Sequence, residues 1–138
     1  ENNILKKELF ELSKINLKNL EEEINKSLIE KNKVLFLAKE VDLDSRNIKD
    51  LTFIIGKKKD NLFLVLASNK GGKPLISCYI SKELVAKKDI NAVDIIRVLG
   101  KHIVGSGGGQ TFFATSGGKN PDGIKKALAE AELIFSKL

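Results

Sequence analysis

Cysteine is scarce in this sequence: the chain contains only Cys78, which has no partner for an intrachain disulfide. A zinc site built on cysteines is excluded as well, because one cysteine and one histidine cannot supply a four-ligand shell. No apolar run approaches the roughly 18 residues that a membrane-spanning helix needs. The chain starts with Glu-Asn-Asn and shows no apolar signal region. We therefore expect a soluble protein of a reducing compartment, the cytoplasm.

Methionine is missing altogether, including an initiator. We interpret this as a sign that the sequence is a segment of a longer protein, which favours a module over a complete enzyme. The 138 residues predict one folded domain, with room for an additional helical arm. A chain of this length buries roughly two-thirds of its unfolded surface, so its core needs no disulfide or metal to hold it.

Positive charge is concentrated in the second half of the chain. The net charge is +6, and residues 61–138 contribute +5 of it through 11 basic and 6 acidic side chains. Residues 1–33 hold seven lysines and seven acids, which cancel. A basic balance suits a polyanionic partner such as nucleic acid, although ordinary solubility explains a charge of this size equally well.

Residues 1–33 are predicted to form one long helix, because the segment lacks proline and glycine. Apolar side chains recur at steps of three and four residues in two runs, 5–12 and 17–28. A lone helix cannot bury such a stripe, so it must pack on the following domain, on another copy or on sequence absent here. We expect a helical arm over 1–33, as a linker or oligomerisation helix, and a globular domain over 34–138.

The rest of the chain alternates short apolar strands with amphipathic helices. Asp44 or Ser45 caps the first of these helices, and Asn91 caps the second. The predicted elements are strands at 34–41, 62–67, 75–80 and 111–115, and helices at 45–55, 92–104 and 121–138. With the N-terminal helix, the order α-β-α-β-β-α-β-α predicts an α/β sandwich of the α+β type, with one mixed sheet and packed helices.

Glycine is concentrated in two clusters, at 105–109 and at 117–118. Neither matches a nucleotide-binding motif. A Walker loop needs a glycine five residues before Gly-Lys and a serine or threonine after it, but Phe113 and Asn120 occupy those places. The dinucleotide fingerprint needs a further glycine where Gln110 stands, and it follows a strand, not a helix.

The glycines at 105–109 are instead predicted to form a loop between a helix and a strand. Successive glycines expose backbone N–H groups that bind phosphate oxygens, and they let a bulky partner approach the main chain. The same composition also suits a flexible or tightly packed connection without a ligand. The sequence leaves both interpretations open.

Catalytic chemistry finds little support in the sequence. His102 lies near a predicted helix end, where it is a candidate general base or helix-terminus cation, but no nucleophile or acid is spaced to it. Cys78 alternates with Tyr79 in a predicted strand and is expected in the core. The two carboxylates at Asp42 and Asp44 lie at a predicted strand end and a predicted helix cap, and these positions explain them without a catalytic role. We therefore assign no catalytic or metal-ligating residue.

Basic side chains gather around the predicted hairpin, the second helix and the glycine clusters. Residues 70–101 hold seven basic and three acidic side chains, and a shared edge would turn them into a surface for phosphates. Tyr79, Phe112 and Phe113 are candidates to stack on bases, but strand alternation favours core positions. Backbone and shape recognition of a folded nucleic acid is therefore predicted over base reading. The predicted RNA-binding residues are Lys70, Lys73, Lys82, Lys87, Lys88, Arg97, Lys101, Gly105, Gly107, Gly108, Gly109 and Lys119.

Four segments follow one another in a characteristic order: Ile80–Leu84, an amphipathic helix into the 105–109 glycines, Ala114–Gly118 and a closing amphipathic helix. In this order the chain resembles the C-terminal domain of bacterial alanyl-tRNA synthetase, which is related to the small domain that accompanies DHH phosphoesterases. The specific part of the resemblance covers about residues 76–128. The helix over 1–33 matches the helical arm expected before that domain.

The resemblance implies a tRNA-binding module that grips the outer corner of alanine tRNA and helps aminoacylation and editing act on the same tRNA. No cofactor is expected in this segment, since ATP and zinc belong to other domains of such a ligase. The phosphoesterase relatives hold substrate phosphates with their glycine loop and place their metal-binding Asp-His-His residues in another domain. The family often has Arg-Pro-Asp-Met after the glycines, where this chain has Gln110–Phe113, so roles of that arginine and aspartate do not transfer.

Three functions follow as expectations. The first is a non-catalytic tRNA-binding and positioning module of an alanine–tRNA ligase, with lysines on phosphates and glycines that permit close backbone approach. The second is an oligomerisation module of the same enzyme, a homodimer paired through the arm and the last helix. The third is the substrate-binding domain of a DHH-type phosphodiesterase, which would prefer short oligonucleotides or cyclic dinucleotides to tRNA.

Overall fold

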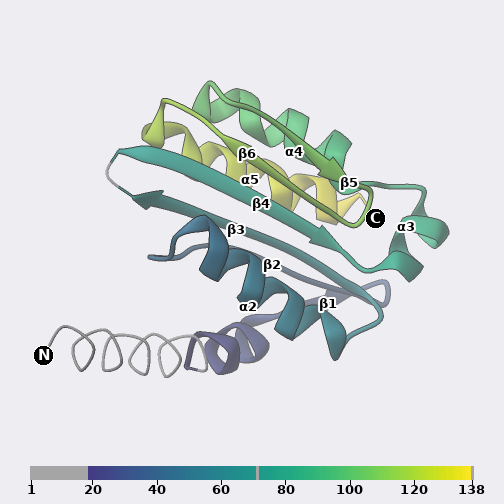
Figure 1. Cartoon of the computed structure of the whole chain (residues 1–138). Coiled ribbons are helices and arrows are strands. Elements are labelled where there is room, and N and C mark those ends of the chain that lie inside the picture. The colour runs from purple at the N-terminus through teal and green to yellow at the C-terminus, as the bar shows by residue number, and fades with distance from the viewer. Residues whose placement is uncertain (1–18, 71, 138) are drawn as a thin grey trace, which may run out of the picture.

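A six-stranded mixed sheet with helices on both faces forms the fold (Figure 1). The computed structural model describes residues 19–70 and 72–137. Its strands are β1 (Ile29–Lys31), β2 (Val34–Glu40), β3 (Leu62–Lys70), β4 (Lys73–Ile80), β5 (Ser106–Gln110) and β6 (Phe113–Gly117). After the helix at 19–27 come α2 (Ser45–Lys57), α3 (Lys82–Lys88), α4 (Ala92–Gly100) and α5 (Ile124–Ser136), with short 3-10 helices η1 (Lys101–Ile103) and η2 (Pro121–Gly123). The predicted fold class, a mixed sheet with packed helices, is confirmed.

The strands lie in the order β1-β2-β3-β4-β6-β5, so the C-terminal pair β5 and β6 extends the sheet beyond β4. β2 and β3 run parallel and are joined through α2, whereas the other neighbouring pairs of the described sheet are antiparallel. The hairpin predicted from the two apolar strands around residues 68–73 is confirmed as β3 and β4. Because β6 pairs with β4, the glycine-rich β5 becomes the strand at the outer edge.

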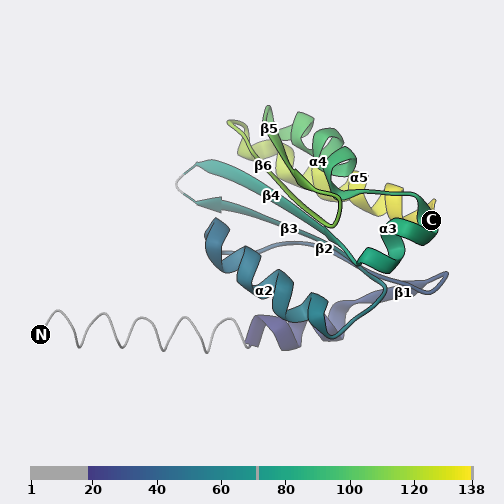
Figure 2. The same ribbon diagram turned by 45° about the vertical axis from the view of Figure 1, so that its right-hand side comes forward.

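Helices cover both faces of the sheet (Figure 2), and an apolar layer lies between the helices and the sheet on each face. α4 and α5 cover one face, where Phe36 packs between Phe63 and Phe135 with ring centroids 5.2 and 4.5 Å away. α2 and the helix at 19–27 cover the other face, where Leu51 and Ile55 are fully buried. Burial of large aliphatic and aromatic side chains on both faces stabilises this arrangement, at about 25 cal/mol for each Å² of apolar surface removed from water.

The helix predicted over residues 1–33 ends earlier than expected. Residues 19–27 are helical, but the three residues of β1 then pair with β2. Asn32 and Lys33 make the turn between these strands with φ angles of 52° and 66°. Ile24 is fully buried against the α2 layer, so the domain itself covers this part of the apolar stripe. The run at 5–12 lies outside the described residues.

Two further elements were not predicted from the sequence, α3 and β5. The seven residues of α3 are too few to show a helical period, and they follow directly after β4. β5 consists of Ser-Gly-Gly-Gly-Gln, a composition with low strand propensity. Pairing with β6 imposes the strand conformation there. The prediction of a loop at 105–109 is therefore wrong for the residues that form β5.

Candidate nucleic-acid interface

The glycine-rich strand β5 presents bare backbone at the edge of the described sheet. It pairs with β6, and Gly108 stands opposite Thr115. The two backbones approach so closely that a Cβ added to Gly107 would lie 2.0 Å from the Thr115 carbonyl oxygen. An outermost strand turns every second peptide group away from its neighbour, so N–H donors of β5 face outward without side chains to screen them. The approach of a nucleic-acid partner to this glycine backbone stays a prediction.

Four of the predicted basic residues lie at one end of the sheet. Lys73 and Lys119 line a surface cavity of about 590 Å³ beside the N-terminus of α2. Lys119 also lines a neighbouring cavity of about 520 Å³, together with Lys101 and Gly105. Lys70 stands opposite Lys73 in the register of β3 and β4. We call Lys73, Lys101 and Lys119 the basic end.

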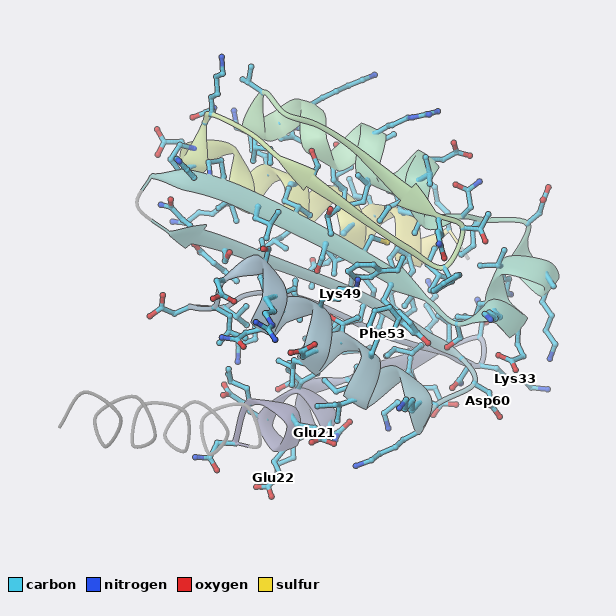
Figure 3. The ribbon with its side chains drawn as sticks, in the orientation of Figure 1. Glu21, Glu22, Lys33, Lys49, Phe53 and Asp60 are labelled. Carbon is cyan, nitrogen blue, oxygen red and sulfur yellow. The ribbon has the colours of Figure 1, made fainter. Side chains whose placement is uncertain are left out.

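Three other predicted lysines, Lys82, Lys87 and Lys88, lie at the opposite end of the sheet. They belong to α3, which follows the far end of β4 (Figure 1). Lys87 and Lys88 line a cavity of about 550 Å³ with Lys33 and Asp60, both visible at this end in Figure 3. A strand rises about 3.3 Å per residue, so the length of β4 puts roughly 25 Å between the two groups. The predicted lysines therefore do not share one edge.

Arg97 lies on the exposed surface of α4, one helical turn before Lys101 of the basic end. Its Nη1 atom is 4.0 Å from a carboxylate oxygen of Asp94, and the two side chains are 68% and 71% exposed. An ion pair this exposed contributes little to stability. The RNA-binding role of Arg97 stays a prediction.

His102 has an acidic partner that the sequence did not reveal. Its Nε2 atom contacts the carboxylate of Glu130, which joins η1 to α5. The two residues are 28 positions apart, and only the packing of α5 beside α4 brings them together. This contact includes no nucleophile, so we interpret the pair as a structural contact between η1 and α5.

The structure confirms the core position predicted for Cys78 and the capping role predicted for Asp44. Cys78 is fully buried, and burial raises the pKa of its thiol well above the usual value. The Asp44 carboxylate accepts a hydrogen bond from the Asn47 backbone N–H at 2.8 Å and so caps α2. Across 19–70 and 72–137, His, Cys, Asp and Glu side chains form no group of three that could hold a metal ion. The helices of this described part all fall short of the length and apolarity that crossing a bilayer requires.

Four aromatic side chains gather on the face of the sheet that carries α2. Phe53 of α2 contacts Tyr79, Phe112 and Phe113, with ring centroids 5.9, 6.4 and 5.1 Å from its own. All four are partly exposed, so the core positions predicted for the strand aromatics are only partly realised. The Lys82 ammonium lies 5.2 Å from the centroid of the Phe112 ring. The role of Phe53 could not be predicted from the sequence, because helical spacing alone does not show which strand residues its ring contacts.

Known proteins similar to this chain point to one family. The model of the DHHA1 domain matches residues 30–137. The alanine–tRNA ligases of Christiangramia forsetii and Flavobacterium psychrophilum are 52% and 47% identical to it, over 96% and 92% of its length. The chain spans only 15% and 14% of the length of these relatives. The crystal structure of the C-Ala domain from Aquifex aeolicus alanyl-tRNA synthetase matches with a TM-score of 0.67 at 26% identity, over 78% of this chain and 96% of that one.

Proposed function

Because the chain belongs to the DHHA1 domain family and is homologous to the C-terminal domain of alanyl-tRNA synthetase, we propose that it binds and positions alanine tRNA. In this proposal the chain is a non-catalytic module of a cytoplasmic alanine–tRNA ligase and contacts the outer corner of the tRNA. Aminoacylation and editing belong to other parts of that ligase, which handle ATP, alanine and zinc. The module contributes affinity and orientation.

The observation that carries the proposal is the position of Gly105 next to the basic end. Gly105, which leads into β5, lines the same cavity as Lys101 and Lys119. The Gly105 N–H donates to the Gly100 carbonyl, so the lysine ammonium groups are the donors that would bind phosphate oxygens here, and the glycine keeps this part of the cavity wall free of a side chain. Interactions of this kind fix the position of a nucleic acid without reading its bases. Such a surface favours a partner recognised by shape, as a folded tRNA is.

The test is a binding titration with a transcript of alanine tRNA at several salt concentrations. A triple variant with Lys73→Gln, Lys101→Gln and Lys119→Gln removes the basic end. We expect weaker binding and a plot of log K against log salt that is shallower by roughly 0.7–0.9 for each phosphate that the variant no longer neutralises. A second variant, Lys87→Ala with Lys88→Ala, measures whether the α3 end binds one or two phosphates.

The matched control changes three exposed lysines that line none of the cavities described above, with the substitutions Lys26→Gln, Lys57→Gln and Lys137→Gln. It loses the same charge, so a fall in affinity from net charge alone would appear equally in both variants. Single-stranded RNA of equal length is the second control and should bind less tightly than folded tRNA. Equal slopes for the test and control variants, or equal affinity for both RNAs, would contradict the proposal.

The two alternatives raised by the sequence are separated by other measurements. A homodimer predicts a sedimentation coefficient that rises with protein concentration. A phosphodiesterase-like substrate domain predicts binding of cyclic dinucleotides or short oligonucleotides in preference to tRNA. Both stay predictions, since the apolar run at 5–12 lies outside the described residues and the relatives above are ligases.

A further inference from the structure

We propose that a groove between α2 and the β5–β6 hairpin holds one nucleobase of the bound tRNA. This inference rests on the tRNA-binding function proposed above and adds stacking of a base to the binding of phosphates. The groove is lined chiefly by Lys49, Phe53, Gly108, Gly109, Phe112 and Phe113. We call it the aromatic groove.

The groove exists because α2 covers only part of its face of the sheet. α2 contacts β3 and β4, and its apolar layer includes no residue of β5 or β6. On β6, Ala114 is buried under the opposite layer, so Phe113 and Thr115 are left on the α2 face, where both are partly exposed. Lys49 and Phe53 lie one helical turn apart on the side of α2 nearer the hairpin (Figure 3). They form one wall of the groove, and the hairpin forms its floor.

The aromatic rings in this groove differ from those of the core. Phe36 and Phe63 are 2% and 0% exposed, whereas Phe53, Phe112 and Phe113 keep part of their surface open. Packing against its neighbours holds Phe53 in place, so a planar ligand meets a pre-positioned ring. Stacking on such rings accepts any base, because every base has a π-face.

Gly108 supplies an independent observation that the groove is kept clear. A Cβ added there meets nothing within 4 Å, in contrast to Gly107, where it would overlap the backbone of β6. Packing therefore requires glycine at 107 but not at 108. Glycine in a strand costs stability relative to residues with a side chain. Gly108 therefore leaves the groove open beside Phe112 and Phe113, so a ligand has room to lie flat on the strand there.

Charge and size favour a nucleobase as the occupant. Lys49 lines the groove, and the Lys82 ammonium lies 5.2 Å from the centroid of the Phe112 ring at its border. These cations suit a base whose attached phosphates are anionic. The groove has a volume of about 270 Å³, below the roughly 300–1,000 Å³ typical of pockets that enclose a whole small molecule. It therefore fits a flat ring whose sugar and phosphate stay outside.

The test uses two substitutions that leave the charge unchanged: one adds a side chain to the groove, and the other removes an aromatic ring from it. Gly108→Val puts a β-branched side chain into open space on a strand, which favours the folded state. Phe53→Leu removes the central ring. We expect each variant to bind folded alanine tRNA roughly 5- to 150-fold more weakly, as for removal of one stacked base. The salt dependence should stay unchanged, because every lysine that neutralises a phosphate is still present.

Leu133→Ala is the matched control, since it removes a 61% exposed apolar side chain from α5 on the other face of the sheet. Circular dichroism and thermal melting establish that all three variants fold. If the variants bind tRNA as tightly as the unmodified chain, the groove holds no base, and the proposed function stands. A shallower salt slope would assign the weaker binding to phosphates and overturn the stacking proposal. If the unmodified chain itself fails to bind tRNA, the proposed function fails and the inference with it.

Discussion

Gly107 stands opposite Ser116 in the β5–β6 hairpin, and the backbone of the Thr115–Ser116 segment lies too close to Gly107 to leave room for a side chain. A Cβ on Gly107 would lie 2.0 Å from the Thr115 carbonyl oxygen and 2.6 Å from the Ser116 Cα. The next residue, Gly108, has open space at the same position. Two adjacent glycines in one strand therefore have different physical roles, one in packing and one at the surface.

This difference predicts opposite effects of the same substitution. Gly107→Ala should lower the free energy of unfolding by roughly 1–3 kcal/mol, because the strand pair must separate to admit the methyl group. Gly108→Ala should leave it unchanged or raise it by up to about 1 kcal/mol, since alanine restricts the unfolded chain. Urea denaturation of both variants measures the difference. An equal fall in the two would show that the hairpin does not have this close approach.

Burial of Cys78 predicts a fall in stability at alkaline pH. The folded thiol has a raised pKa and keeps its proton, whereas the unfolded thiol ionises above about pH 8.5. This contribution to stability is therefore present below that pH and is lost as the pH rises, by up to about 1.4 kcal/mol per pH unit. Urea denaturation between about pH 8 and 9.5 measures it, and Cys78→Ala should show a smaller dependence on pH. Native protein should also react slowly with a thiol reagent that labels the unfolded chain at once.

Tyr79 offers a direct titration of the edge of the aromatic groove. Burial raises the pKa of its phenol above the usual value near 10, the Glu83 carboxylate raises it further, and the Ser81 side chain opposes both. Because the chain has one tyrosine and no tryptophan, absorbance near 295 nm reports this group alone. Glu83→Gln should lower the midpoint, and the unfolded chain should titrate at the ordinary value. A native midpoint at or below the ordinary value would contradict the burial of the ring.

The contact between His102 and Glu130 predicts that these two residues stabilise the fold and do not bind tRNA. Both side chains are partly buried, at 29% and 33% exposure, and the contact ties η1 to α5. Single changes to alanine should each lower the free energy of unfolding by about 1 kcal/mol, and the double variant should lose less than their sum. A double-mutant cycle in urea measures this coupling. Affinity for tRNA should be unchanged in the folded variants; a specific fall in affinity would instead place His102 in the interface.

Most regular elements could be predicted because their signals are local. Asp44 and Asn91 indicate the starts of α2 and α4 through caps that the structure contains, each accepting a hydrogen bond from a backbone N–H three residues ahead. The buried strands β3 and β4 were recognisable as short apolar runs. β5 was not, because nothing in Ser-Gly-Gly-Gly-Gln favours a strand until β6 lies beside it.

The candidate site was predicted less well than the fold. Two lysines of the basic end, Lys101 and Lys119, do come together with Gly105, the predicted glycine that precedes β5. Lys87 and Lys88 do not join them, because β4 carries the chain to the other end of the sheet before α3 begins. Phe53 was missed altogether, since its ring partners come from other elements of the chain.

Most of the elements, the mixed α/β class and the family of this protein follow from its amino-acid order alone, because caps, periodicity and motif order are properties of neighbouring residues. Three features emerge only in the folded chain: the glycines form an edge strand, Gly107 is packed while Gly108 is open, and Phe53 meets the aromatics of β4 and the hairpin. These features depend on strand order, which places β6 beside β4 and leaves β5 outside. Strand order is set by contacts between residues far apart in the chain, and no local pattern encodes it.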